Sequence, residues 1–375
     1  HRQRFHLPLL LCNMPLFLTP SPQHYAWGGD HYLYDLMEQQ PSGKPAAELW
    51  LGAHPKAPAT LTGTDRTLIE YIATDPNKVL GSNIVEQFGP HLPYLMKVLD
   101  VRKMLSIQVH PDKKTAETGF AREEAKGIAR TSPNRNYRDN NHKPELGVAI
   151  SDFYLLHGFK STAAIRQSLI GIPEWTKLLP IFENEGTAGL YEYVMRAEQE
   201  TIDQLLSGLG FRLLGGQYNR MQPEFWARRA VEQYTDQGHF DRGIFSIYWL
   251  NLVHLRSGEG IFQAAGIPHA YLEGQCIELM AASDNVIRGG LTQKHIDVAE
   301  LLTTISFDPV SPVVLSPLKA SDGWSVYHTP VSDFKLTCLR NLRPRGRNPP
   351  VVFRYCQCRE SSIESLLADN SVTGW

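Results

Sequence analysis

The chain has 375 residues, of which 42% are hydrophobic and 20% are charged, and its formal net charge is −2. This length accommodates two or three domains with a sizeable core, and the composition is that of an ordinary globular protein. Without a dominant basic or acidic block, nothing indicates a nucleic acid or a membrane surface as partner, although a few local cations could hold an anionic small molecule.

The first residues, HRQRFHLPLLLCNMPLFLTP, have the basic start and apolar run of a signal peptide. Pro8 and Pro15 interrupt that run, and no small-residue cleavage site follows. We therefore treat residues 1–13 as upstream sequence and Met14 as a possible natural start. No stretch is long and apolar enough to span a bilayer. The five cysteines lack the spacing of a disulfide framework, so we expect reduced thiols in a cytoplasmic protein.

The first part of the chain has the pattern of a β-rich region. Residues 14 to about 110 are short apolar runs separated by Gly and Pro, with one helix expected near 67–74. Residues 111–141 are polar and predict a short helix or two in a surface excursion. Residues 142–160 return to strand-like character.

A helical pattern follows. Over 161–240, apolar residues recur at helical spacing, as in Ile202, Leu205, Leu206 and Leu209, which predicts an inserted helical domain. From Gly243 the period returns to two, and short strands joined by Gly-containing turns indicate an antiparallel barrel or jelly roll. Strands before and after the helical block would then belong to one sheet system. The predicted fold is mainly β with an inserted α-helical domain, an α+β architecture.

The stretch LSIQVHP places two polar residues on one face of an expected strand. Gln108 and His110 are two residues apart, whereas Ile107 and Val109 have the other parity and would pack behind them. The pair is either half of a metal site or a set of hydrogen-bonded core groups.

Two further segments carry residues suited to metal binding. In NNHKPELGVAI, Lys143 and Glu145 share a face of an extended chain; the alternative is a surface salt bridge. In AAGIPHAYLEG, His269 lies in a Gly-flanked turn before a strand; the alternative is a surface loop histidine. Together, Gln108, His110, Glu145 and His269 suit Zn²⁺ with an open position better than a closed structural site, where thiolates dominate.

The stretch AASDNVIRGGLTQK supplies charged groups. Asp284 and Arg288 are four residues apart and would share a strand face, and Lys294 follows the turn. Arg and Lys near a metal favour a phosphate or enolate oxyanion. Alternatively, Asp284 belongs to a Ser-Asp-Asn turn and Arg288 is an exposed strand charge. We assign Trp27, Trp50 and His54 to packing or to a pocket wall.

Five motifs follow one another along the chain: YAWGGD, ELWLGAHPKA, LPYLMKVLDVRKMLSIQVHP, YRDNNHKPELGVAI and GIPHAYLEGQCIELMAASDNVIRGGLTQKHIDV. Their residues and order resemble those of the type I mannose-6-phosphate isomerases. The resemblance covers roughly residues 20–310. It implies a zinc enzyme with cupin-like jelly-roll barrels. A catalytic domain would comprise 14–160 with 241–315, a helical domain would span 161–240, and a second jelly roll would occupy 316–375. After about residue 340 the expected strand pattern is lost, so this last domain would be incomplete or altered.

The resemblance also implies residue roles. One Zn²⁺ per chain would be bound by Gln108, His110, Glu145 and His269. The essential arginine corresponds to Arg288, and groups for proton transfer or substrate contact correspond to His142, Lys143 and Asp284. Residues near the substrate phosphate correspond to Ser106 and Lys294, and Lys97 is a further candidate for substrate binding.

The implied reaction interconverts mannose 6-phosphate and fructose 6-phosphate by proton transfer from C2 to C1 through an enediol-like species. Which of Lys143 and Asp284 moves the proton is open, and His142 is a candidate for ring opening. Two alternatives are a cupin metal oxygenase, which usually carries His-x-His, and a non-catalytic regulator that binds a sugar phosphate. We expect a monomer whose partner is a small sugar phosphate, with neither nucleic acid nor membrane involved.

Overall fold

The computed structural model describes residues 16–320, 324–339, 351–356 and 362–367. The predictions for residues 1–13 and Met14, and much of the prediction for the end of the chain, concern residues outside this part.

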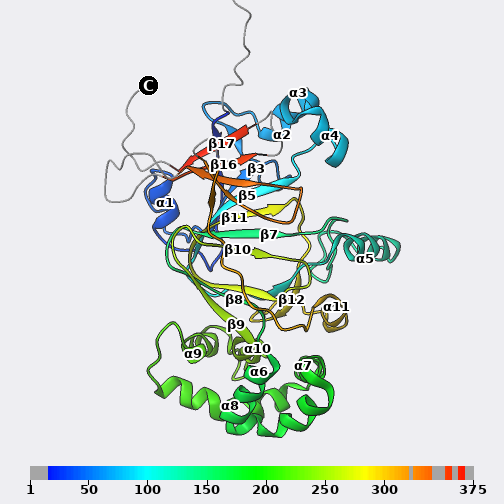
Figure 1. Ribbon diagram of the computed structural model, residues 1–375, viewed down its shortest axis with the longest axis vertical. Coiled ribbons are helices and arrows are strands. Elements are labelled where there is room, and N and C mark those ends of the chain that lie inside the picture. Colours follow the sequence, from blue (N-terminus) through cyan, green and yellow to red (C-terminus); the bar gives the residue numbers. More distant parts are fainter. Residues whose placement is uncertain (1–15, 321–323, 340–350, 357–361, 368–375) are drawn as a thin grey trace, which may run out of the picture.

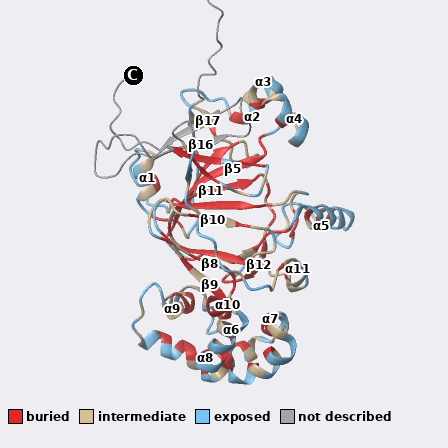
Figure 2. Cartoon of the chain, in the orientation of Figure 1, coloured by how far each residue is buried: buried red, intermediate tan, exposed pale blue. Residues whose placement is uncertain are grey.

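A ten-stranded antiparallel sheet forms the centre of the molecule, and most of its strands are buried (Figures 1 and 2). Its strands are β2 (Ser21–Gln23), β3 (Glu48–Gly52), β5 (Tyr94–Val101), β6 (Ile107–Val109), β7 (Glu145–Ala149), β8 (Phe153–Phe159), β9 (Leu250–Leu255), β10 (Gly260–Gln263), β11 (His269–Ala281) and β12 (Ile287–Gly290).

Strand β11 connects two halves of this sheet. Its second half pairs with β5 and β7, and its first half pairs with β6 and β8. The register shifts between Tyr271 and Glu273. Gly274 follows with φ +121, where an added Cβ would lie 2.3 Å from the Asp152 carbonyl oxygen, so the bend requires glycine.

The helical block lies at one end of the molecule, beyond β8 and β9 (Figure 1). It consists of α6 (Thr162–Gly171), the 3₁₀ helix η1 (Pro173–Leu178), α7 (Leu179–Arg196), α8 (Gln199–Gly215), α9 (Pro223–Tyr234) and α10 (Gly243–Trp249). Strands β8 and β9, which flank this block in sequence, pair with each other, with Phe153 opposite Leu255. The prediction that strands before and after the block share one sheet system is confirmed.

The predicted start of the strand region at Gly243 is wrong, because residues 243–249 form helix α10. All seven residues of this helix are buried. A helix that is apolar and buried on all sides shows no hydrophobic period, so GIFSIYW is indistinguishable from a buried strand by pattern.

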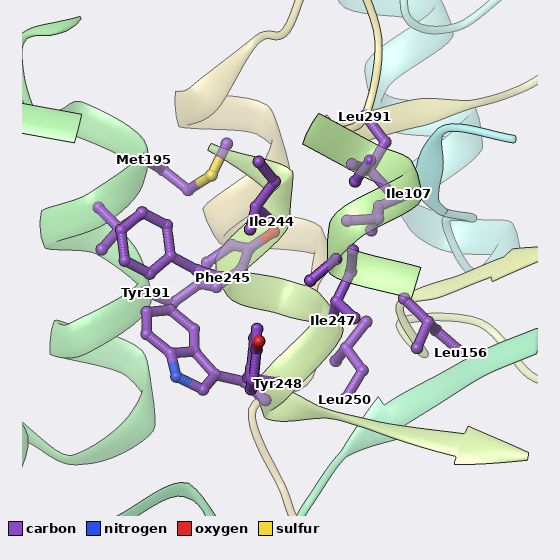
Figure 3. Close-up of a cluster of buried hydrophobic side chains, with 14 of the residues drawn as sticks. Ile107, Leu156, Tyr191, Met195, Ile244, Phe245, Ile247, Tyr248, Leu250 and Leu291 are labelled. Carbon is purple, nitrogen blue, oxygen red and sulfur yellow. The ribbon is translucent and has the colours of Figure 1, made fainter. Parts of the chain in front are cut away.

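The largest core cluster joins the helical block to the back of β6 (Figure 3). Ile107 packs with Ile244 and Ile247 of α10 and with Leu291, and Val109 belongs to the same cluster. Burial of each such side chain contributes about 1.5–3 kcal/mol. The prediction that Ile107 and Val109 pack behind Gln108 and His110 is confirmed, and this packing orients β6.

The remaining helices surround the sheet. They are α1 (Tyr32–Leu36), α2 (Leu68–Thr74), α3 (Pro76–Leu80), α4 (Ser82–Phe88), α5 (Lys113–Ala125) and α11 (Val298–Thr304). The predicted helix near 67–74 is α2, where Thr67 and Glu70 form a capping box. The expectation of a single helix before residue 110 is wrong. Short helices such as α3, which begins with Pro76 after the cap Asp75, offer too few turns to show a period.

Two smaller sheets complete the structure. Strands β1 (Leu18–Thr19) and β4 (Thr60–Leu61) form a pair. A five-stranded sheet near the end of the chain contains β13 (Leu318–Lys319), β14 (Ser325–Tyr327), β15 (Leu336–Leu339), β16 (Val351–Cys356) and β17 (Ser362–Leu367). Across the described ranges, none of the helices combines the length and apolar character needed to cross a membrane.

Candidate metal and substrate site

Three strands bring the predicted metal ligands side by side. In the antiparallel register, Gln108 of β6 is opposite His269 of β11 and opposite Arg288 of β12. Residues directly opposite each other lie on the same face of a sheet. His269, Gln108 and Arg288 therefore form a row across three neighbouring strands.

The ligand atoms of His110, Glu145 and His269 converge within 4.8 Å of one another. His110 Nε2 is 3.3 Å from Glu145 Oε1, and His269 Nε2 is 3.4 Å from Glu145 Oε2. All three side chains are at least 99% buried. Nε2 of each histidine and Oε2 of Glu145 have no hydrogen-bond partner among the described residues. Buried polar atoms are rarely left unpaired, so these three indicate a bound cation.

The opposite ring nitrogens fix the histidine tautomers. His110 Nδ1 is 2.8 Å from the carbonyl oxygen of Asn285, and His269 Nδ1 is 2.9 Å from that of Ile267. A carbonyl oxygen only accepts, so each Nδ1 carries the proton and each Nε2 presents a lone pair. Burial, together with the charge of Lys143, lowers the pKa of His110 to about 4 and keeps its ring neutral. These residues fit zinc, which takes neutral imidazole and carboxylate ligands in open sites.

Beside this cluster lies a cavity of about 750 Å³. Its lining includes seven of the residues proposed from the sequence, which are Lys97, Ser106, Gln108, Lys143, Glu145, Arg288 and Lys294.

Lys143 and Glu145, which both line the cavity, are in contact. Lys143 Nζ is 3.0 Å from Glu145 Oε1, and both side chains are buried. Burial alone would raise the pKa of Glu145, but Lys143 and His110 hold it well below its usual range. The prediction that the two side chains share a face is confirmed, and a surface salt bridge is excluded.

Positive charge gathers around Arg288. The pKa of Arg288 is lowered by burial and then by the nearby charge of Arg138. The pKa of Lys294 is lowered by burial and then by the charges of Arg288 and Arg138. Mutual lowering of this kind indicates cations close enough to repel one another. An anionic substrate group would relieve that repulsion.

Residues 16–162 match the family model described as phosphomannose isomerase type I, catalytic domain. The mannose-6-phosphate isomerase of Escherichia coli strain K12 is 36% identical over 328 residues, which cover 84% of this chain and 81% of that protein. The human mannose-6-phosphate isomerase is 34% identical over 352 residues, with coverage of 85% and 80%. The chain belongs to the mannose-6-phosphate isomerase family.

The fold agrees with this membership. A crystal structure of mannose 6-phosphate isomerase bound with zinc and yttrium matches with a TM-score of 0.78 at 36% identity. The match covers 87% of this chain and 83% of that one. Membership of the mannose-6-phosphate isomerase family confirms the resemblance found in the motifs, and a zinc-bound relative accords with the ligand cluster.

His142 and Asp284, which the family resemblance implies in proton transfer or substrate contact, lie outside the lining of the 750 Å³ cavity. His142 Nε2 is 2.9 Å from Asp333 Oδ1. Asp284 contacts His54 at 3.3 Å and Lys56 at 2.5 Å, in a neighbouring cavity of about 350 Å³. Burial alone would raise the pKa of Asp284, but His54 and Lys56 lower it.

The prediction that Asp284 and Arg288 share a strand face is wrong. Strand β12 begins only at Ile287, and residues 283–286 are irregular. Ser283 Oγ accepts from the backbone N–H of Asn285, and the side chains of Ser283 and Asn285 donate to the carbonyl oxygen of Asn141 in the distant loop 138–141. These bonds compete with a strand ladder.

Sequence reasoning missed three charged residues of this region. Glu278 forms a buried ion pair with Lys97 at 2.9 Å, and Glu48 lies in the same cavity wall and accepts a hydrogen bond from Trp50 Nε1. Carboxylates inside apolar strands, as in QCIELMA and AAELWLG, were the available signal, because such groups are costly to bury without a partner. Arg138 has no comparable signal, since it lies in a polar loop.

Proposed function

We propose that this chain is a zinc-dependent isomerase that interconverts mannose 6-phosphate and fructose 6-phosphate. The observation that carries the proposal is the set of unpartnered buried atoms on His110, Glu145 and His269, placed beside a cavity that also contains Lys143 and Arg288. The relatives from Escherichia coli and human are named mannose-6-phosphate isomerase, which supports the same activity.

Zn²⁺ would be held by Gln108, His110, Glu145 and His269, one ion per chain. When bound, it supplies a Lewis acid that polarises substrate oxygens. Gln108 enters this set because it is opposite His269 and on the same face, and its amide oxygen is a suitable neutral ligand.

The reaction moves one proton from C2 of the open-chain aldose to C1 and a second proton from the C2 hydroxyl oxygen to the C1 oxygen, so that the C1 carbonyl becomes a hydroxyl and the C2 hydroxyl becomes the carbonyl. We assign the proton transfer to Nζ of Lys143, because it lines the cavity; as a neutral amine it would take the proton from C2 and return it to C1. Asp284 faces the neighbouring cavity and is held by His54 and Lys56. Arg288 would stabilise the negative charge that develops on the enediolate oxygen.

We place the substrate phosphate against Ser106 and Lys294, which line the same cavity as Arg288. Arg138 would add to the positive potential there. Lys97 is paired with Glu278, so we propose that it shapes the cavity wall and contacts sugar hydroxyls rather than the phosphate.

We further propose the domain division implied by the family: a cupin-like catalytic domain of 14–160 with 241–315, a helical domain of 161–240, and a C-terminal jelly roll in 316–375. The catalytic-domain match ends at residue 162, and the pairing of β8 with β9 closes the sheet behind the helical block. A monomer in the cytoplasm remains our prediction; the buried thiol of Cys276 is free.

A coupled assay tests the activity. Purified zinc-loaded protein is given mannose 6-phosphate, and fructose 6-phosphate is detected by a coupled dehydrogenase. We expect conversion that stops on chelation and returns on addition of Zn²⁺. Stoichiometric zinc with no conversion would contradict the proposal and favour a sugar-phosphate-binding regulator, whereas iron in place of zinc would favour an oxygenase.

A further inference from the structure

A single buried asparagine connects three segments of the proposed zinc site. Asn285 lies between β11 and β12, three residues before Arg288, and its side chain is fully buried. We propose that Asn285 is a positioning residue: it holds the zinc ligand His110 and the loop that delivers Lys143 and Glu145 in one fixed arrangement. This inference rests on the proposed zinc-dependent function.

The side-chain amide of Asn285 is fully used on the loop 138–141. Its Oδ1 accepts from the backbone N–H of Arg138 at 2.7 Å and of Asp139 at 3.2 Å. Its Nδ2 donates to the carbonyl oxygens of Asp139 at 2.8 Å and Asn141 at 2.9 Å, and to Asp139 Oδ1 at 3.2 Å. Residues 142–145 follow this loop directly. The amide therefore fixes the point from which Lys143 and Glu145 enter the site.

The backbone of Asn285 acts on the other side. Its carbonyl oxygen accepts the proton of His110 Nδ1 at 2.8 Å. This bond selects the tautomer in which Nε2 of His110 faces Glu145 Oε1, at a distance of 3.3 Å. The position of that carbonyl depends on the side-chain bonds of the same residue, so the orientation of His110 and the path of the 138–141 loop are coupled.

Neighbouring groups brace the arrangement. Ser283 Oγ donates to Asp139 Oδ1 at 2.8 Å and accepts from the backbone N–H of Asn285 at 3.2 Å. Asp139 Oδ2 accepts from the backbone N–H of Asp284 at 2.7 Å. Because these bonds share partners, removal of one member loosens the others.

The test compares Asn285→Ala with a matched control. Asn251 is a second structural asparagine, whose Nδ2 donates to the carbonyl oxygens of His157, Gly158, Phe159 and Val310. Asn251→Ala removes a similar number of bonds without touching the loop 138–141 or His110. Ser283→Ala is a milder variant that keeps the Asn285 amide and removes the three hydrogen bonds of Ser283 Oγ. It serves as the test if Asn285→Ala does not fold.

The readouts are the rate of Zn²⁺ release to a chromogenic chelator, kcat and KM, and the melting temperature of each apo-protein. We expect roughly 10–100-fold weaker zinc retention in Asn285→Ala, as for other residues that orient a metal ligand. A smaller change in the same direction is expected in Ser283→Ala, with kcat falling more than KM rises. Asn251→Ala should lower the melting temperature and leave zinc release unchanged.

Zinc release from Asn285→Ala or Ser283→Ala at the wild-type rate, with only a lower melting temperature, would overturn the inference while the wild-type activity stands. A wild-type protein that binds no zinc would instead overturn the proposed function on which the inference rests.

Discussion

Replacement of Lys97 by methionine tests the electrostatics of the cavity wall. Lys97 on β5 is directly opposite Glu278 on β11, and Nζ and Oε2 are 2.9 Å apart. The two side chains are only 10% and 6% exposed. Lys97→Met keeps most of the buried volume but leaves the Glu278 carboxylate without its closest cation.

The loss is large. Two unit charges at this distance attract by about 6 kcal/mol at an effective dielectric constant of ~20. Removal of one partner from a buried ion pair destabilises a protein by about 3–5 kcal/mol, because the other charge remains uncompensated. We expect Lys97→Met to lower the free energy of unfolding by this amount at neutral pH.

The loss also depends on pH. Burial raises the pKa of Glu278, and Lys97 opposes that rise, so the pKa rises further in Lys97→Met. A carboxyl group whose pKa is raised on folding must take up a proton. The variant is therefore most stable below the unfolded-state pKa and loses stability as pH rises through the folded-state pKa. The difference from wild type should widen from about pH 5 to about pH 8.

The free energy of unfolding is measured by urea titration of the apo-protein at about pH 5 and about pH 8, with tryptophan fluorescence as the signal. The proteins compared are wild type, Lys97→Met, Glu278→Gln and the double variant. The double variant should be more stable than Lys97→Met at about pH 8, since no carboxylate is left buried. The reasoning is refuted if Lys97→Met lowers the free energy of unfolding by less than about 1 kcal/mol at both about pH 5 and about pH 8. It is also refuted if the losses of the two single variants simply add in the double variant.

Three further variants test the assigned roles. Arg288→Met should lower kcat by about 10²–10³ while zinc content stays at one ion per chain, and loss of zinc instead would show a structural role. Gln108→Leu should weaken zinc binding by roughly tenfold or more in a chelator competition; unchanged affinity would remove Gln108 from the ligand set. His142→Ala should keep kcat within about tenfold of wild type because His142 contacts Asp333, whereas a general acid or base would contribute about 10²–10⁴.

The parts of the site that the sequence predicts are those set by strand geometry. The alternation of Ile107, Gln108, Val109 and His110 follows from the two-residue period of an extended chain, and the core behind β6 has the predicted members. The contact between Lys143 and Glu145 follows from the same rule. These relations are local, so no knowledge of the partner strands is needed.

Relations between distant segments could not be obtained in this way. Asp284 departs from the face of Arg288 because Asn285 bonds to residues 138–141, about 145 positions away in sequence. The pairing of Lys97 with Glu278 depends on the register of β5 against β11. Both facts depend on which strands are neighbours, which a single sequence with local patterns does not specify.

A zinc titration tests the central claim most directly. Apo-protein receives Zn²⁺ in sub-stoichiometric steps, and the rate of conversion of mannose 6-phosphate to fructose 6-phosphate is recorded after each addition. The proposed site of Gln108, His110, Glu145 and His269 predicts a rate that rises linearly and levels off at one zinc ion per chain. Full activity without added metal, or a rate that does not respond to bound zinc, would contradict it.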